Sequence, residues 1–555
     1  MGASHQAPLS PKLLEQLTHE PTLRPYLKNW SSTYNLTPSL LFHPVSTREL
    51  SLILSEAHKR GKHVRAVGEH HSPGPIWHSD QWLISMRHFK QVQINQKHRT
   101  ARLGAGLTLR EANPLLAEFG LSFTVIGSLP DVSIGAFFSG PDHGSSAFHS
   151  LCPNMALSAK IVLPTGEVVE AKKGEELYRA AGGGVGGVGV VTEVEWQLDE
   201  AFGLEVEMER VRLEDYLKDK SGRSLWELAR SREFVKMWYF PHPTLPMTGG
   251  ANTVLWRGRR VAMPPAQQPS LFSNFTALLF RVFHGLLILF TLYLFPRAQQ
   301  FVNGLLFWMQ GASLPATTVG RSYEMQAMDC LYNQLANEWT IPLPAPTACS
   351  TRSSAAPKSP AIELLRSLVT YFDSPTGRDL GMHAPFEIRF NRCDEEGKEF
   401  YLSPTAPIRR PQGDATAEQK KDDLVVWLEP IIYRPLNLPT PSRFYASNQF
   451  WESLLRTATP GFTSGRPHWC KAHFPTSPAE SARMFPEGNV EAFHRIRKGV
   501  DPKGIMWSEW LEGRVPTPPS LVSAEERKGR ESTSWESEKE AKAARKWEDV
   551  MGSRK

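Results

Sequence analysis

Glycine is concentrated in three segments within the first third of this 555-residue chain. They cover residues 127–135, 139–146 and 182–192, and serine accompanies glycine in the first two. Such residues leave backbone N–H groups uncovered, and clustered N–H groups form concavities that hold pyrophosphate oxygens. The third segment leads into a β-branched run, where bare backbone can approach a flat ring. None follows the Gly-x-Gly-x-x-Gly fingerprint in its strand-to-helix setting. The chain is therefore expected to fold around a ligand that carries a phosphate or a ring.

A histidine-containing turn precedes these glycine segments. It reads Val67-Gly68-Glu69-His70-His71-Ser72-Pro73 and follows a basic, β-branched run at residues 61–67 that predicts a short strand. Pro73 prevents an inner strand or a helix from continuing. The turn can therefore present the imidazole of His71 to a bound cofactor. The alternative is a solvated loop histidine, which is the commoner case for an isolated His-Ser-Pro.

Residues 386–390 alternate apolar and charged side chains. On a strand, Glu387 and Arg389 project from one face, while Phe386, Ile388 and Phe390 face the core. A carboxylate and a guanidinium side by side can grip a polyol, because arginine keeps its charge and offers several fixed donors. The alternative is an exposed strand face that carries an ion pair.

Residues 465–471 place a histidine and a lysine on either side of an aromatic residue. His468 and Lys471 would project together if the segment is extended or tightly turned. Lys471 is then a candidate for contact with a cofactor or a substrate oxygen, and His468 is a second one. Alternatively, Trp469 is a core residue and Lys471 extends along the surface to reach water.

In their order and spacing, these segments resemble the vanillyl-alcohol oxidase type of FAD-binding domain and, within it, the aldonolactone oxidoreductases. Residues 43–50, 103–109 and 501–505 also match the family's pattern. The resemblance implies an α+β fold. It has a two-subdomain FAD-binding domain and an α+β substrate (cap) domain with an antiparallel sheet.

The resemblance also implies FAD as the cofactor, covalently joined to His71. In the family, glycine precedes the linking histidine, where this chain has His70, so the linking residue could be either histidine. Pro141 and Asp142 are further departures, in a loop expected to pass near a phosphate. By position, the resemblance assigns cofactor binding to Gly68, His71, Ser72, Pro73, Gly127, Ser128, Ser133, Gly135, Ser139, His143, Gly144, Gly186, Gly189 and Val190.

For the reaction, the resemblance implies FAD-dependent oxidation of an aldono-1,4-lactone of the D-arabinono-1,4-lactone type. The product is an ascorbate-type ene-diol, and O2 is reduced to H2O2. Glu387, Arg389, Lys471 and His468 are the expected catalytic residues. Three alternatives stay open: a dehydrogenase that passes electrons to cytochrome c, an alditol oxidase, and a membrane-attached binding protein without flavin.

The length of the chain predicts more than one domain. We expect a lead-in at residues 1–36, the FAD domain at 37–205, a substrate domain at 206–515 and a charged tail at 516–555. The 63 basic and 57 acidic residues give a formal charge of +6, and their scattered distribution argues against nucleic acid as a partner. Five cysteines without a C-x-x-C pair argue against a disulfide framework and against a metal site, and favour a reducing compartment.

An apolar insert interrupts the substrate domain at about residues 271–310. Its central run, residues 282–295, contains no Asp, Glu, Lys or Arg. As a helix this run would span about 21 Å, short of the roughly 30 Å hydrocarbon core. We therefore expect a hairpin that enters one leaflet, with residues 301–308 as its second limb. The alternative is an apolar helix buried in the substrate domain. The N-terminus has no apolar signal core, so secretion is not expected, and the resemblance implies a mitochondrial membrane.

Overall fold

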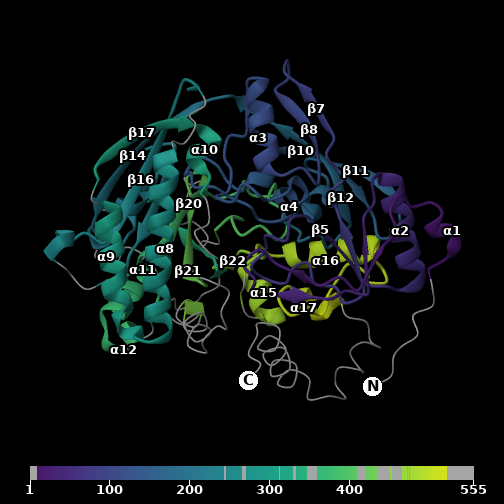
Figure 1. Cartoon of the computed structure of the whole chain (residues 1–555). Helices are drawn as coiled ribbons and strands as arrows, with labels where there is room; N and C mark the ends of the chain where they lie inside the picture. The colour runs from purple at the N-terminus through teal and green to yellow at the C-terminus, as the bar shows by residue number, and fades with distance from the viewer. Residues whose placement is uncertain are drawn as a thin grey trace, which may run out of the picture.

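The computed structural model describes residues 9–242, 246–265, 271–311, 313–328, 333–346, 359–379, 381–408, 420–434, 451–452, 455, 465–471, 473 and 475–521. In Figure 1 the chain forms two lobes, with β20, β21 and β22 between them. The predicted tail lies outside the described residues beyond Leu521. The fold has the expected α+β composition.

The first sheet of the FAD-binding lobe has four strands in the order β1-β4-β6-β5. These are β1 (Thr22–Leu23), β4 (Leu40–Phe42), β6 (Trp82–Ser85) and β5 (Val64–Val67). The last three are parallel, and β1 pairs antiparallel with β4. Helix α2 (Thr47–Arg60) covers them; Ser46 caps its start by accepting a bond from the Glu49 amide, and Gly61 ends it at φ 61°.

The second sheet of this lobe is antiparallel, in the order β11-β10-β12-β8-β7. Its strands are β11 (Val168–Lys172), β10 (Ala156–Val162), β12 (Val190–Gln197), β8 (Thr100–Gly104) and β7 (Val92–Asn95). The adjoining helices are α3 (Leu109–Glu118), α4 (Ile134–Ser139) and α5 (Glu176–Ala181). The three glycine segments are the connections at the ends of α4, α5 and β12, so the sheet and helices bring them to one side of the lobe.

The other lobe is built on a nine-stranded antiparallel sheet in the order β17-β14-β16-β15-β20-β21-β19-β22, with β18 also pairing with β21. The strands are β14 (Gly203–Val211), β15 (Phe234–Tyr239), β16 (Thr253–Val261), β17 (Ala316–Arg321), β18 (Gln334–Ala336), β19 (Trp339–Leu343), β20 (Phe386–Arg392), β21 (Leu424–Tyr433) and β22 (Arg466–Pro467). The expected antiparallel substrate sheet is confirmed, although β14 begins slightly before the domain boundary we predicted.

The remaining elements are short or lie at the edges. The helices are α1 (Pro11–Leu14), α6 (Leu213–Leu217), α7 (Arg223–Ala229), α8 (Leu271–Tyr293), α9 (Gln299–Gly311), α10 (Ser322–Gln326), α11 (Pro360–Asp373), α12 (Pro375–Asp379), α15 (Pro478–Met484), α16 (Asn489–Val500) and α17 (Glu509–Glu512). The short strands are β2 (Leu27–Lys28), β3 (Asn35–Leu36), β9 (Leu121–Ser122) and β13 (Asp199–Glu200). Short 3-10 turns are η1 (Cys152–Met155), η2 (Pro246–Thr248), η3 (Pro296–Ala298) and η6 (Pro519–Leu521).

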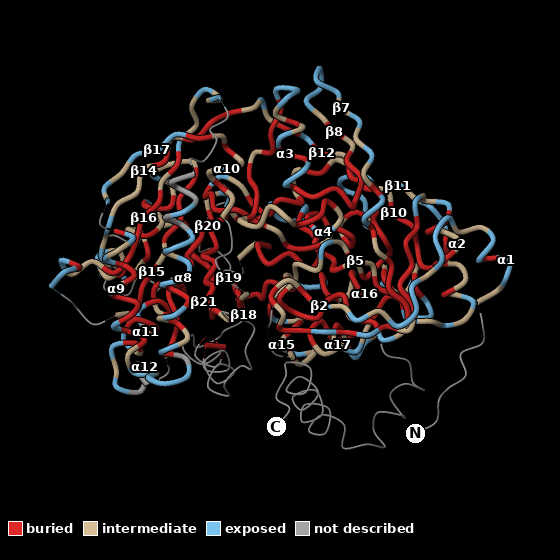
Figure 2. Tube along the Cα trace, in the orientation of Figure 1, coloured by how far each residue is buried: buried red, intermediate tan, exposed pale blue. Residues whose placement is uncertain are grey.

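The apolar insert forms the helix pair α8 and α9, which lies against the large sheet (Figure 1). One side of α8 is buried, at His284, Ile288 and Thr291. Figure 2 shows pale blue and tan positions along the rest of α8, although the sequence there is apolar. Among the described residues, no helix combines the length and the hydropathy needed to cross a membrane.

The C-terminal segment returns to the first sheet. The amide of Val64 in β5 donates to the carbonyl of Ile505 at 2.8 Å. The guanidinium of Arg65 donates to the carbonyl of Met506 at 2.9 Å. This segment therefore brings residues near position 506 to the strand from which the histidine turn emerges.

Candidate functional site

One cavity between the two lobes collects nearly all of the predicted site residues. From the FAD-binding lobe it is lined by the histidine turn and by the three glycine segments. From the other side it receives Arg389, His468 and Lys471. Of the predicted set, Gly144 and Glu387 do not line it: Gly144 packs behind the wall, and Glu387 is held by Arg389.

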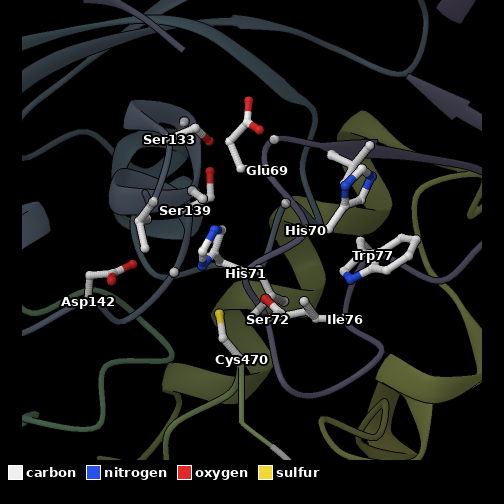
Figure 3. A pocket seen from close by; sticks show the side chains of 18 of the residues that line it. Glu69, His70, His71, Ser72, Ile76, Trp77, Ser133, Ser139, Asp142 and Cys470 are labelled. Atoms are coloured by element: carbon white, nitrogen blue, oxygen red, sulfur yellow. The ribbon is translucent and has the colours of Figure 1, made fainter. Parts of the chain in front are cut away.

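The histidine turn has the shape that glycine normally adopts, although histidine occupies the position. His70 has φ 56°, a left-handed conformation that histidine tolerates at a cost. Its ring packs against Trp77, with ring centroids 5.0 Å apart. In Figure 3 the His70 ring lies beside Trp77, whereas His71 lies between Ser139 and Cys470 in the cavity. The turn is therefore retained, and His71 is the histidine that it presents to the cavity.

Neighbouring segments hold this turn closely. A Cβ on Gly68 would lie 2.2 Å from Oγ of Ser133 in the next glycine segment. A Cβ on Gly74 would lie 2.7 Å from the carbonyl of Lys471, and the Gly74 amide donates to the carbonyl of Cys470 at 3.2 Å. The turn thus contacts both the phosphate-type loops and the lysine segment. Burial lowers the pKa of His71, which keeps its ring neutral.

Other glycines leave open space in the cavity. A Cβ on Gly127 or Gly186 would come no closer than 3.4 Å to any protein atom, so packing does not require glycine there. Gly186 has φ 67° and is fixed by Arg65, whose guanidinium donates to the carbonyls of Val185 and Gly186 at 2.5 and 3.2 Å. Bare backbone that faces a cavity suits close approach by a planar or phosphate-bearing group. These residues fit an FAD molecule.

Asp142 is the departure that faces the cavity most directly. Figure 3 shows its carboxylate turned toward the interior from the left. Burial raises the pKa of Asp142 to about 7, and Lys471 partly offsets this rise. The side chain is therefore largely uncharged below neutral pH, which reduces its repulsion of a phosphate.

The predicted pair on β20 is buried. Glu387 and Arg389 form an ion pair, and both side chains are almost inaccessible to water. Phe386, Ile388 and Phe390 face the core as expected. The alternative of an exposed strand face is therefore wrong. Burial opposes the charge on Arg389, but Glu387 and Glu338 outweigh it and raise the pKa of Arg389.

The Lys471 side chain is only 15% exposed and lies between two carboxylates, so it does not extend along the surface. Its Nζ lies 2.5 Å from Oε1 of Glu429 and 3.6 Å from Oε2 of Glu338. Burial opposes its charge, but these two carboxylates raise the pKa of Lys471. Burial and the nearby Glu338 carboxylate raise the pKa of Glu429 to about 7, because together they outweigh the opposite effect of Lys471. Residues 468–471 form a tight turn, because the Lys471 amide donates to the carbonyl of His468 at 2.9 Å.

His143 and His468, which also line the cavity, differ in their surroundings. His468 Nδ1 accepts a bond from the Cys470 amide at 3.3 Å, so its Nε2 carries the hydrogen. Burial holds the pKa of His468 well below its usual value, which makes it a neutral donor. His143 stacks on Trp427 with centroids 3.7 Å apart, and its Nε2 lies 3.1 Å from Oε1 of Glu338.

Glu338, Glu429 and Trp427 were not predicted. Glu387 lies opposite Glu429 in the β20–β21 ladder. Ala336 faces Ile431 and Trp339 faces Leu428, so the same register places Glu338 opposite Glu429. Three buried carboxylates therefore form one row, and Arg389, Lys471 and the imidazole of His143 lie beside it. The row depends on pairing between distant strands, and no local motif announces it.

Comparison with known proteins agrees with this arrangement. The family model of D-arabinono-1,4-lactone oxidase matches residues 194–514. The chain belongs to this family. The model of an FAD-binding domain matches residues 38–172, so the chain is an FAD-dependent oxidoreductase.

Two relatives span almost the whole chain. The D-arabinono-1,4-lactone oxidase of Eremothecium gossypii is 24% identical, over 86% of this chain and 93% of that protein. The L-gulonolactone oxidase of Scyliorhinus torazame is 26% identical, over 87% of this chain and 97% of that protein. The expected relationship to aldonolactone oxidases is confirmed.

Solved structures share the fold at low sequence identity. Cholesterol oxidase from Brevibacterium sterolicum superposes with a TM-score of 0.67 at 14% identity, over 92% of this chain and 99% of that one. A chitooligosaccharide oxidase gives a TM-score of 0.60 at 15% identity, over 91% and 98%. Together with the FAD-binding match, these likenesses confirm the expected vanillyl-alcohol oxidase type of fold.

Proposed function

We propose that this protein oxidises an aldono-1,4-lactone of the D-arabinono-1,4-lactone type to an ascorbate-type ene-diol and reduces O2 to H2O2. The observation that carries the proposal is the single cavity in which a glycine-lined wall faces Arg389, Lys471 and His468. Membership of the aldonolactone oxidase family supports the reaction class.

Each charged residue has a separate task in this reaction. FAD, when bound, accepts the hydride that leaves the carbon beside the lactone carbonyl. Arg389, positioned by Glu387, stabilises negative charge that develops on the reacting oxygens, because its guanidinium is fixed before the reaction begins. Lys471 orients the same oxygens and donates to Oε1 of Glu429, whose raised pKa allows its carboxyl group to hold a proton. His468 donates a hydrogen bond from Nε2. Burial of the cavity strengthens all of these interactions.

We further propose that FAD is covalently attached through His71. The position of His71 in the cavity and the direction of His70 toward Trp77 support this assignment. The visible spectrum of the purified protein after acid precipitation tests it. His71→Ala should release the flavin into the supernatant, whereas His70→Ala should not. The reverse result would assign the linkage to His70.

The overall proposal is tested by mixing the flavin-containing protein with D-arabinono-1,4-lactone. Bleaching of the flavin and formation of H2O2 are expected. Reduction of cytochrome c without H2O2 would favour a dehydrogenase. Reaction with alditols but not with lactones would favour an alditol oxidase. A colourless protein that keeps its fold would contradict the enzymatic proposal and favour a binding protein.

We also propose that α8 and α9 hold the protein at a membrane, which we place in the mitochondrion. The outer side of α8 exposes large apolar side chains at the spacing of one helix face: Leu279, Val282, Leu286, Phe290 and Tyr293. Such a face suits partial insertion into one leaflet.

Replacing Leu279, Val282 and Leu286 with Gln tests the membrane proposal, because these exposed residues can change without leaving a core cavity. The triple variant should move from the membrane pellet to the supernatant after cell fractionation. A matched change of exposed apolar residues elsewhere, Leu23→Gln with Val168→Gln, should not. Unchanged sedimentation of the triple variant would contradict attachment through α8. A parent protein that does not co-purify with mitochondrial membranes would contradict the mitochondrial location.

A further inference from the structure

Glu338 is a buried carboxylate that the reaction outlined above does not use. It immediately precedes β19 and lines the cavity, and its side chain is 1% exposed. Within the described part of the chain, neither of its oxygens receives a well-aligned hydrogen bond. Buried carboxylates are almost always satisfied, so an open one beside a cavity indicates that a ligand completes it.

Two basic side chains lie beside Glu338, one against each carboxylate oxygen. Nε2 of His143 lies 3.1 Å from Oε1, and Nζ of Lys471 lies 3.6 Å from Oε2. Lys471 is engaged more closely with Glu429, at 2.5 Å. His143 is fixed by its stack on Trp427 and by the contact between Nδ1 and the Gly144 carbonyl at 2.9 Å. The carboxylate is thus held in its ionised form with capacity to accept further hydrogen bonds.

The position of Glu338 separates it from the reacting centre. Glu387, Glu429 and Glu338 lie on successive strands, so Glu338 is two strand spacings, about 9.6 Å, from Glu387. A single ring hydroxyl cannot reach both ends of the row. A ligand that contacts Arg389 with its reacting oxygen would therefore present a different hydroxyl to Glu338.

A metal ion is another ligand that such a group could hold. The ligand atoms of His143, Glu338 and His468 lie within 4.8 Å of one another. However, Nζ of Lys471 and the guanidinium of Arg389 already place positive charge beside Glu338. Nδ1 of His468 accepts from the Cys470 amide, so Nε2 carries a hydrogen and cannot coordinate without a change of tautomer. A neutral hydroxyl donor fits these surroundings better.

We propose that Glu338 is a substrate-contacting residue that accepts a hydrogen bond from a lactone hydroxyl remote from the carbon being oxidised. It thereby selects polyhydroxylated lactones over those that lack this hydroxyl. The inference rests on the proposed lactone oxidation. A lactone without this hydroxyl would leave the buried carboxylate without its hydrogen bond. Binding sites discriminate most strongly against substrate analogues of this kind.

The test combines one substitution with substrate analogues. Glu338→Gln keeps the size of the side chain and removes its charge. Flavin reduction is measured in the parent and the variant with D-arabinono-1,4-lactone and with its 3-deoxy and 5-deoxy analogues, which retain the reacting hydroxyl. With the full lactone, the variant should lose about 10- to 100-fold in kcat/KM, as expected for a charged hydrogen bond. With the analogue that lacks the contacted hydroxyl, the substitution should lower kcat/KM by less than about threefold. The reason is that neither the parent nor the variant can then form the hydrogen bond between residue 338 and this hydroxyl.

Glu399→Gln is the matched control. Glu399 is 4% exposed and is ion-paired with Arg179 at 3.4 Å, but it does not line the cavity. Its substitution should affect all three lactones equally. If Glu338→Gln impairs folding, Glu338→Asp, which keeps the charge but shortens the reach, gives the same comparison. Melting temperature and FAD content are recorded for each variant.

A uniform loss across the three lactones, or no loss with any of them, would overturn the proposal. So would Zn²⁺ binding at micromolar concentration that Glu338→Gln abolishes, since the site would then be a metal site. Failure of the proposed function gives a different result, because the parent protein itself would show no flavin reduction with any lactone.

Discussion

The two walls of the cavity are built in opposite ways. The wall in the FAD-binding lobe depends on glycines, which have no side chain. Gly127 and Gly186 leave the backbone uncovered, and Arg65 fixes the loop from behind. The wall in the other lobe relies on buried charges that rigid strands hold in pairs, such as Glu387 with Arg389 and Glu429 with Lys471. A cofactor wall of this kind should tolerate loss of charge but not added bulk. The charged wall should behave in the opposite way.

The largest effect should come from breaking a buried ion pair in the charged wall. Lys471→Met removes the cation closest to Glu429 and leaves this buried carboxylate uncompensated, which should cost about 3 to 5 kcal/mol of unfolding free energy at pH 8. The folded variant should bind a proton that the unfolded chain releases, so its stability should fall as pH rises from about 5 to 8. Urea unfolding across this range measures both effects.

A second change controls for the loss of the lysine itself. Glu429→Gln in the Lys471→Met background removes one orphaned charge and should recover most of the lost stability. Lys398→Met breaks an exposed pair with Glu395 at 2.7 Å and should cost less than about 1 kcal/mol. If Lys471→Met and Lys398→Met lower the free energy of unfolding by the same amount, the proposed contrast between the walls is wrong.

The next effect concerns the rate of the reaction. Arg389→Ala should slow flavin reduction about a hundredfold, corresponding to about 3 kcal/mol, because a preorganised donor is lost where charge develops. Arg389→Lys should recover only part of the rate, since it keeps the charge but loses the planar fork. Stopped-flow absorbance with saturating lactone measures this step. A rate within about threefold of the parent would remove Arg389 from the reaction.

A smaller effect should appear at Asp142, the acid in the cofactor wall. Its folded pKa of about 7 exceeds its unfolded value, so the folded state holds a proton that the unfolded state releases. Stability should therefore fall as pH rises from about 4 to 7. Asp142→Asn should remove this slope and stabilise the protein at pH 8 by about 2 kcal/mol. Parallel slopes for parent and variant in pH-dependent denaturation would contradict the assignment.

The smallest effect on stability should come from the glycine wall. Gly186→Ala should cost about 1 kcal/mol, because φ 67° is unfavourable for alanine. Gly186 lines the cavity and the added methyl group would lie 3.6 Å from the guanidinium that fixes the loop, so less FAD should also be incorporated. Gly249→Ala has the same backbone cost at φ 60° with open surroundings, and serves as the control. The flavin content per protein, read from the visible spectrum of each purified variant, measures the difference; equal FAD content in the two variants would show that the cavity tolerates the methyl group.

Local patterns predicted the parts of the site that lie within single segments. Alternation along one strand was enough to pair Glu387 with Arg389 and to place three apolar neighbours in the core. Glu338 and Glu429 could not be predicted, because their row exists only through the register of strands that are far apart in the chain. The left-handed conformation of His70 was indicated only by the glycine that the family has at this position, since histidine itself does not favour it.

The hydrogen bond from Arg65 to the carbonyl of Met506 has a consequence for biosynthesis, because it joins residues that are 441 positions apart. At ribosomal speeds of about 5 to 20 residues per second, roughly 20 to 90 s separate the appearance of the two partners. During that interval the nascent chain carries the histidine turn without the contact that closes its strand. Stable retention of FAD should therefore begin only after translation has passed residue 506.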